Sequence, residues 1–137
     1  MPGPGPSQAE HLSKADLFNI YYPPQDYGYF YENGLLFPDC GSVSIPLDPT
    51  YRENGCLQIV PGSHKLGRLD HKRKGDLASV DTERLEEIFK VMGEPVMAET
   101  KRGDVLFFHS NLLHTSGPNI SPGKRWNLVL AFNQVGT

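Results

Sequence analysis

The sequence has few cysteines and no long hydrophobic run. Its only cysteines, Cys40 and Cys56, are too few for a disulfide-stabilised secreted scaffold and form no C-x-x-C pair of the kind that binds zinc or carries redox chemistry. No stretch approaches the roughly 18 apolar residues that cross a bilayer, and no apolar signal segment opens the chain. We therefore expect two buried free thiols in a reducing compartment, no membrane partner and an intracellular, cytoplasmic location.

An excess of positive charge is also missing. The 137 residues carry 13 Lys and Arg against 16 Asp and Glu, a formal net charge of −3, which argues against nucleic acid as a partner. The most basic run, residues 71–74 (His-Lys-Arg-Lys), lies between Asp70 and Asp76. A solvated loop explains this run better than a phosphate-binding patch does.

Turn residues divide the chain into short segments. Residues 1–24 open with alternating Pro and Gly and continue with polar residues, so we expect a disordered or atypical N-terminal segment. Beyond it, one β-rich domain is expected over residues 25–137. A helix capped by Asp81 or Thr82 should end at Gly93. The expected strands are 42–47, 56–60, 104–109 and 126–133.

The order of these elements predicts the fold class. Several short strands separated by Gly and Pro turns, without strand–helix alternation, favour an antiparallel sandwich or barrel over a parallel sheet. A mainly β double-stranded β-helix, the jelly roll of the cupin type, fits best, with one short α-helix packed on a sheet.

Three polar residues are candidates for a metal site. His109 and His114 stand five residues apart in the segment 103–125 (GDVLFFHSNLLHTSGPNISPGKR), and Asp26 is a carboxylate in an aromatic stretch. Non-haem iron(II) oxygenases use two histidines and one carboxylate. Each residue also has a simpler explanation. A histidine beside phenylalanines, such as His109, is more often hydrogen-bonded to backbone, and Asp26 could be an exposed loop residue.

Three sequence blocks in order resemble the phytanoyl-CoA dioxygenase family of iron(II)/2-oxoglutarate oxygenases. They are Gln25–Asp39 (QDYGYFYENGLLFPD), Glu53–Leu66 (ENGCLQIVPGSHKL) and Gly103–Arg125. Together they cover roughly residues 25–135. The resemblance implies the C-terminal, metal-binding half of such an enzyme, with Fe(II) as cofactor, 2-oxoglutarate as cosubstrate and a small-molecule substrate.

The resemblance also assigns roles to four side chains. Asp26 is similar in position to the family's carboxylate ligand, and His114 to its distal histidine ligand. Arg125 corresponds to the residue that binds the far carboxylate of 2-oxoglutarate, a contact for which the planar guanidinium fork is suited and lysine is not. Ser116 is placed to add a hydroxyl hydrogen bond to that carboxylate. His64 is interpreted as a turn or supporting residue.

The chain departs from the family at one iron ligand. The family's first metal motif is His-x-Asp, whereas this sequence reads Pro24-Gln25-Asp26. If the chain is extended here, residues two apart share a face, so position 24 points toward the site and Gln25 points away. The family's N-terminal portion is absent as well. The expectation is an impaired, truncated dioxygenase isoform that hydroxylates a small organic or acyl substrate. The alternative is a catalytically inactive β-sandwich isoform or fragment that acts as a binding module.

Overall fold

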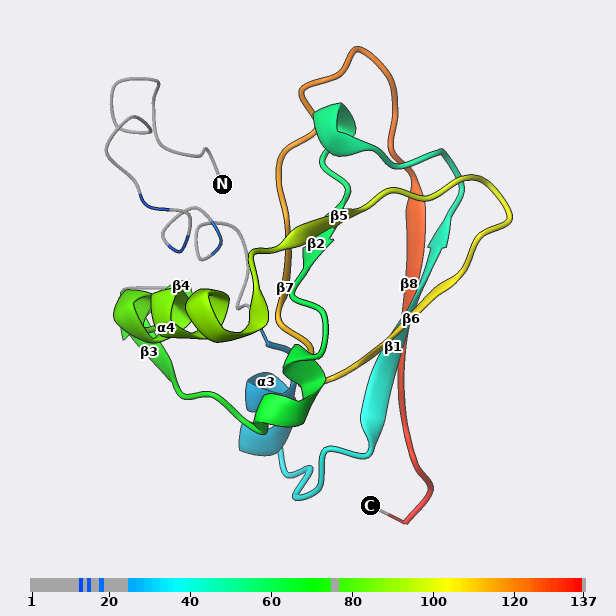
Figure 1. The fold of residues 1–137 in the computed structure, drawn as a ribbon. Coiled ribbons are helices and arrows are strands. Elements are labelled where there is room, and N and C mark those ends of the chain that lie inside the picture. Colours follow the sequence, from blue (N-terminus) through cyan, green and yellow to red (C-terminus); the bar gives the residue numbers. More distant parts are fainter. Residues whose placement is uncertain (1–12, 14, 16–17, 19–24, 75–76, 137) are drawn as a thin grey trace.

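Two small antiparallel sheets form the centre of the molecule. The structure is a computed structural model that describes residues 13, 15, 18, 25–74 and 77–136. Most of the expected N-terminal segment, residues 1–24, lies outside the described residues, so its disorder stays a prediction. The mainly β, antiparallel prediction for the described chain is confirmed (Figure 1).

The first sheet has the strand order β6-β1-β8. Its central strand β1 (Cys40–Pro46) pairs antiparallel with β6 (Leu106–His109) and with β8 (Asn127–Asn133). Val43 lies opposite Phe107 on one side and Leu130 on the other. These apolar partners share one face, because residues directly opposite each other on paired strands point to the same side of the sheet.

The second sheet has the order β5-β2-β7 and faces the first across a cavity. Its central strand β2 (Leu57–Ile59) pairs antiparallel with β5 (Val96–Ala98) and with β7 (His114–Ser116). The expected strands at 42–47, 56–60, 104–109 and 126–133 correspond to β1, β2, β6 and β8. The short strands β5 and β7 were not expected, because three residues are too few to show a period.

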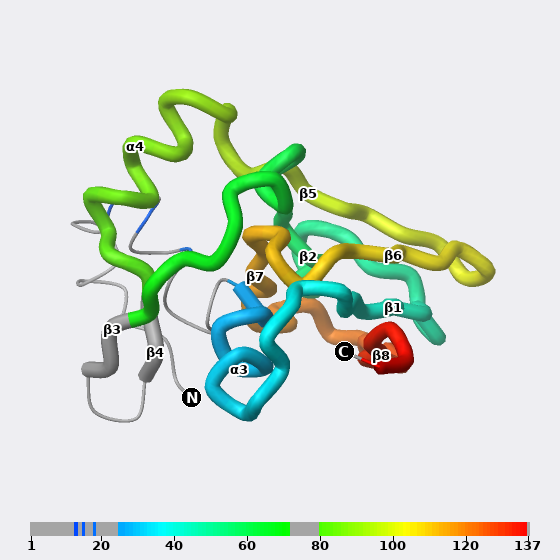
Figure 2. Tube along the Cα trace, turned by 90° about the horizontal axis from the view of Figure 1, so that it is seen from below, coloured from blue at the N-terminus to red at the C-terminus, as the bar shows by residue number. Residues whose placement is uncertain are grey.

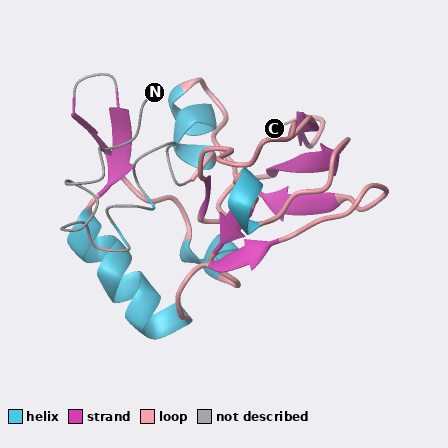
Figure 3. Cartoon of the chain, turned by 90° about the horizontal axis from the view of Figure 1, so that it is seen from above, coloured by secondary structure: helices cyan, strands magenta, loops and turns pink. Residues whose placement is uncertain are grey.

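The remaining elements surround the two sheets. They are α3 (Tyr27–Glu32), η1 (Arg52–Asn54), η2 (Ser63–Leu66), the β3 (His71–Lys74) and β4 (Leu77–Val80) hairpin, and α4 (Thr82–Met92). The prediction of a solvated loop at residues 71–74 is wrong, since this run is a strand paired with β4. The strands of the two central sheets gather on one side of the molecule, and α4 lies on the other with the β3–β4 hairpin beside it (Figure 3).

Helix α4 forms as its sequence predicts. The Asp81 carboxylate accepts hydrogen bonds from the backbone N–H groups of Glu83 and Arg84, which satisfies two donors of the first turn. Leu85 and Ile88 lie on the buried face, and burial of a leucine side chain contributes about 1.5–3 kcal/mol.

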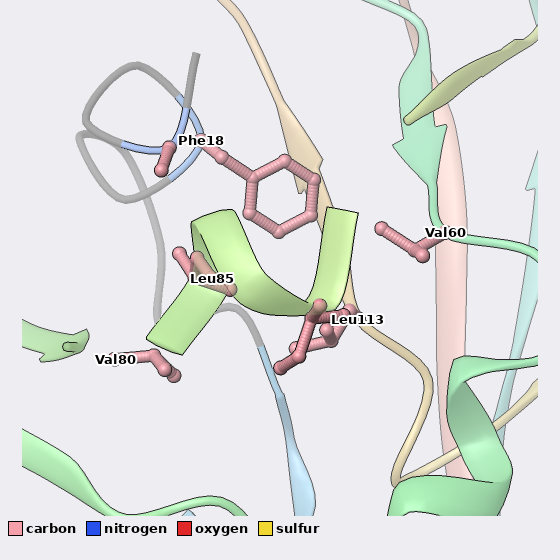
Figure 4. Packing of buried hydrophobic residues seen from close by; sticks show 7 residues of the cluster. Phe18, Val60, Val80, Leu85 and Leu113 are labelled. Atoms are coloured by element: carbon pink, nitrogen blue, oxygen red, sulfur yellow. The ribbon is translucent and has the colours of Figure 1, made fainter. Parts of the chain in front are cut away.

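The main hydrophobic core lies where α4 meets the end of the second sheet (Figure 4). Its buried members are Ala15, Phe18, Val60, Val80, Leu85, Ile88 and Leu113, with Leu69, Phe89 and Met92 partly buried against them. Val60 directly follows β2, and Leu113 directly precedes β7. The core therefore fixes one end of the sheet that carries His114.

The described residues also test the expectations about cysteine and membranes. Cys40 and Cys56 are both free thiols, as predicted, but only Cys56 is buried, while Cys40 is half-buried. Within the described part of the chain, no helix has the length and apolar character needed to cross a membrane.

The first sheet leaves one face uncovered. Ser42, Ser44 and Phe108 face the cavity, whereas the opposite face carries exposed Phe107, Leu128, Leu130 and Phe132. Every residue of β8 is exposed. Trp126, directly before β8, is also 64% exposed.

Among the described strands, β8 is an edge of its sheet and has no partner on its outer side, so we expect it to drive self-association. No charged residue occurs from Trp126 to Gly136, although edge charges are a common protection against strand pairing. Leu130→Lys should lower the weight-average mass measured by sedimentation equilibrium, because a charge in the middle of β8 opposes pairing. Val91→Lys, at an 86%-exposed position on α4, is the control and should leave the mass unchanged. Equal masses for the native and Leu130→Lys chains would contradict the expectation.

Candidate metal centre

Asp26 lies at the N-terminal end of α3 with its carboxylate free of the helix. Its backbone is helical (φ −71°, ψ −32°), and its side chain makes no capping hydrogen bond. The prediction of an extended chain through this residue is therefore wrong. The carboxylate instead lies 3.4 Å from the imidazole of His114, measured between Oδ1 and Nε2. Pro24 lies outside the described residues.

The side chain of Gln25 bonds backbone groups of other segments. Its amide nitrogen donates hydrogen bonds to the carbonyl oxygens of Gly67 (2.7 Å) and Asn111 (2.9 Å). Its amide oxygen accepts a bond from the N–H of Leu69 at 2.7 Å. All three polar groups of this fully buried side chain are thus used, and none is available to a metal.

His114 is the first residue of β7 and is buried. Its Nδ1 lies 2.9 Å from the carbonyl oxygen of Leu112, and Nε2 faces Asp26. Burial opposes a charge on this imidazole, but the hydrogen bond and negative charge of Asp26 outweigh it, so the pKa of His114 is raised. A ring whose Nδ1–H bonds a carbonyl presents Nε2 as a metal donor once the Nε2 proton leaves.

A cavity of about 420 Å³ between the two sheets contains all four predicted site residues. Asp26 and His114 line it together with Ser116 and Arg125. The structure therefore brings together side chains that are as much as 99 positions apart (125 − 26) in the sequence. Their roles as ligands stay predictions.

Arg125 is held by the backbone at Gly55. Its Nη1 donates to the carbonyl oxygen of Gly55, and the rest of the guanidinium remains available to the cavity that it lines. Gly55 has φ +81°, and a Cβ there would collide with the carbonyl oxygens of Gly117 and Pro118. Glycine is therefore required where this carbonyl contacts Arg125.

Several small polar residues of the cavity were not predicted. Ser44 accepts a 2.7 Å hydrogen bond from the Asn127 amide, and Thr50 and Thr100 join their hydroxyl groups at 2.6 Å. Only the alternation of Ser42 and Ser44 with apolar residues in β1 signals a polar inner face. Thr50 and Thr100 meet through an isolated β-bridge that no local pattern reveals.

The donor set fits two positions of a two-histidine, one-carboxylate iron site. Among the described residues, no group of three or more His, Cys, Asp or Glu side chains could hold a metal. His109 is not a further donor, because its Nδ1 accepts a 3.0 Å bond from the N–H of Asn111. This confirms the backbone-bonded interpretation of His109. His64 lies in η2 and is exposed, consistent with the predicted turn position.

Comparison with known proteins identifies relatives of the chain. Residues 16–126 match the family model of phytanoyl-CoA dioxygenase (PhyH). The sequence is 34% identical over 116 residues to an ectoine dioxygenase of Nocardia farcinica, covering 76% of this chain and 38% of the relative. It is 34% identical over 110 residues to phytanoyl-CoA dioxygenase 1 of Oryza sativa subsp. japonica, covering 79% and 37% respectively. The chain thus spans well under half the length of these relatives.

Solved structures confirm the fold. The crystal structure of EctD from S. alaskensis with 2-oxoglutarate and 5-hydroxyectoine superposes with a TM-score of 0.69 at 31% identity, covering 86% of this chain and 40% of that protein. The same enzyme with bound Fe gives a TM-score of 0.65 at 30% identity, covering 80% and 37%. The two facing antiparallel sheets are consistent with the predicted jelly roll.

The ion pair between Asp26 and His114 predicts a pH-dependent stability. Because the folded-state pKa of His114 is raised above its ordinary 6.5, its stabilising contribution is complete below pH 6.5 and is lost as pH rises through the raised pKa. The free energy of unfolding lost in Asp26→Asn should therefore be largest at low pH and should shrink as pH rises. Urea denaturation of the metal-free chains from about pH 5.5 to about pH 8.5 measures this difference.

Glu87→Gln is the control for the general loss of one carboxylate. Glu87 is exposed and pairs with Arg84 on α4 rather than with a histidine. Its effect on the free energy of unfolding should be flat over the same range. If the free energy of unfolding lost in Asp26→Asn were also independent of pH, the coupling between Asp26 and His114 would be contradicted.

Proposed function

Because the chain belongs to the phytanoyl-CoA dioxygenase family, we propose that it is an iron(II)/2-oxoglutarate-dependent dioxygenase that hydroxylates a small organic or acyl substrate with impaired efficiency. The observation that carries the proposal is the 3.4 Å approach of Asp26 and His114 in a cavity that Ser116 and Arg125 also line. The Fe and 2-oxoglutarate in the EctD structures support it by analogy.

The proposed roles follow from the chemistry of the side chains. Asp26 and His114 hold Fe(II), which supplies the oxygen chemistry that no amino-acid side chain provides. Arg125 pairs with the far carboxylate of 2-oxoglutarate, and the Ser116 hydroxyl donates a hydrogen bond to it. Leu106 and Phe108 give the same cavity an apolar side that limits the access of water. No further side chain is assigned a catalytic role.

The sequence also supplies the reason for impairment. Position 24 carries proline where the family has its first histidine ligand, and proline has no side-chain donor. Loss of groups that merely support a ligand typically weakens a metal site by about 10–100-fold. Loss of an imidazole that bonds the metal directly should cost more.

The proposed setting is the cytoplasm, with a small molecule as substrate. The two free thiols are consistent with a reducing compartment. The negative net charge gives no support to binding of nucleic acid. The cavity, in contrast, has the size and the few convergent polar groups of a small-molecule site.

Restoring the histidine tests the proposal directly. Pro24→His should raise Fe(II)-dependent formation of succinate from 2-oxoglutarate by at least about 10-fold, because the third donor is returned to the iron site. Succinate is measured after incubation with Fe(II), 2-oxoglutarate and oxygen. The double variant Pro24→His/Asp26→Ala is the matched control and should lose the gain.

A second candidate function is a catalytically inactive binding module. Pro24 and the uncovered apolar face of the first sheet favour it. Iron-dependent succinate formation by the native chain would exclude this alternative. Absence of succinate from both the native and the Pro24→His chains, with metal bound, would favour it over the dioxygenase.

Arg125 should determine the affinity for 2-oxoglutarate. Arg125→Lys keeps the positive charge but loses the two-pronged contact, so we expect at least about 10-fold weaker binding of 2-oxoglutarate by isothermal titration of the Pro24→His chain loaded with Mn(II). Lys124→Arg is the control, because Lys124 is exposed and does not line the cavity. Unchanged affinity in Arg125→Lys would place the far carboxylate elsewhere.

A further inference from the structure

We propose that Gln25 is a positioning residue that sets how Asp26 and His114 face each other. The inference rests on the proposed function, in which these two residues hold the metal. Gln25 is fully buried. Its side-chain amide donates two hydrogen bonds to, and accepts one from, backbone groups of two other segments. A buried amide with all its hydrogen bonds made, in a side chain that does not line the cavity, indicates a structural role.

The first effect of Gln25 is on Asp26. The amide of Gln25 bonds the carbonyl of Asn111, and the N–H of Tyr27 bonds the carbonyl of Ser110 at 2.9 Å. Both neighbours of Asp26 are thus tied to consecutive residues of the connection between β6 and β7. Figure 2 shows α3 beside β7 and this connection. With both flanking residues held, the backbone of Asp26 is held as well, and so is the direction in which its side chain leaves the chain.

The second effect is on His114, through the segment that contains η2. The N–H of Leu113 donates to the hydroxyl of Ser63 at 2.8 Å, and the N–H of Val60 donates to the carbonyl of Leu113 at 3.0 Å. Ser63 and Leu113 are completely buried. Both backbone groups of the residue before His114 are therefore held by the segment 60–63.

Gln25 connects these two supports. Its bonds to Gly67 and Leu69 attach it just beyond η2, in the same stretch of chain that holds Leu113. Its bond to Asn111 attaches it to the connection that leads into His114. One amide side chain thus joins the segment of Asp26 to both segments that position His114.

Only an amide satisfies this junction. The two carbonyl oxygens of Gly67 and Asn111 need donors, whereas the N–H of Leu69 needs an acceptor. Glutamate would place an oxygen against both carbonyls, and methionine has a similar length but forms none of the three bonds. Gln25→Met consequently removes the hydrogen bonds while largely keeping the packing volume.

Asn54→Leu is the matched control for the loss of a buried amide. Asn54 is also almost fully buried, and its side chain accepts from the N–H of Tyr51 and donates to the carbonyl of Pro49, each at 2.8 Å. It lies in η1, at the opposite end of the molecule from α3 (Figure 1). Both substitutions are expected to lower the urea midpoint.

The first measurement uses metal-free protein. Amide hydrogen exchange of Tyr27 and Leu113 is compared with that of Leu85, whose N–H bonds Asp81 on α4. Global destabilisation accelerates hydrogen exchange at all three amides together. The ratio of the exchange rates of Tyr27 and Leu113 to that of Leu85 therefore reports local opening alone. Gln25→Met should raise the exchange rates of the Tyr27 and Leu113 amides at least about 10-fold relative to that of Leu85. An unchanged ratio, or an equal change in Asn54→Leu, would overturn the proposal.

The second measurement is the affinity for Co(II) alone, followed by its visible absorption. In the Pro24→His chain, Gln25→Met should weaken binding by at least about 10-fold, while Asn54→Leu should change it by less than about threefold. Equal affinities with and without Gln25 would also overturn the positioning role. If Pro24→His binds no Co(II), the proposed function fails, and the exchange ratio alone still decides whether Gln25 positions the pair.

Discussion

Leu113 and His114 are consecutive residues whose side chains point to opposite sides of the second sheet, and the site could not form without this alternation. Leu113 is completely buried against Val60 and α4, and the next side chain must then point to the opposite side, into the cavity between the sheets. Packing of Leu113 in the hydrophobic core thereby sets the direction of the His114 side chain. The core contributes to function through this direction as well as through stability.

The junction of α3 with the connection between β6 and β7 supplies the other half of the site. Asp26 would be an unremarkable residue at the start of a short helix if its neighbours were free to move. Backbone bonding to Ser110 and the buried amide of Gln25 attach that helix next to β7. A carboxylate and an imidazole distant in sequence therefore meet at 3.4 Å, and their attraction raises the pKa of the histidine.

Two features of this chain bear on its proposed chemistry and on its association. One is proline at position 24, where the resemblance to the family places the first histidine ligand of the proposed iron site. The other is the apolar outer face of the first sheet, where Phe107 and Leu130 remain exposed although sheet faces of this composition are usually covered. We propose that the first limits the chemistry, and we expect the second to favour association. They involve different parts of the molecule.

Local sequence patterns were enough to predict several elements and to identify the chemical groups of the candidate site. Alternation predicted β1, the Asp81 cap predicted α4, and three ordered motifs indicated the family together with Asp26, His114 and Arg125. Three features became visible only in the folded chain: Asp26 lies at the start of a helix, Gln25 is a buried junction, and Thr50 meets Thr100. Those features depend on contacts between distant segments. A local pattern records the preferences of each segment but carries no information about which segments will pack together.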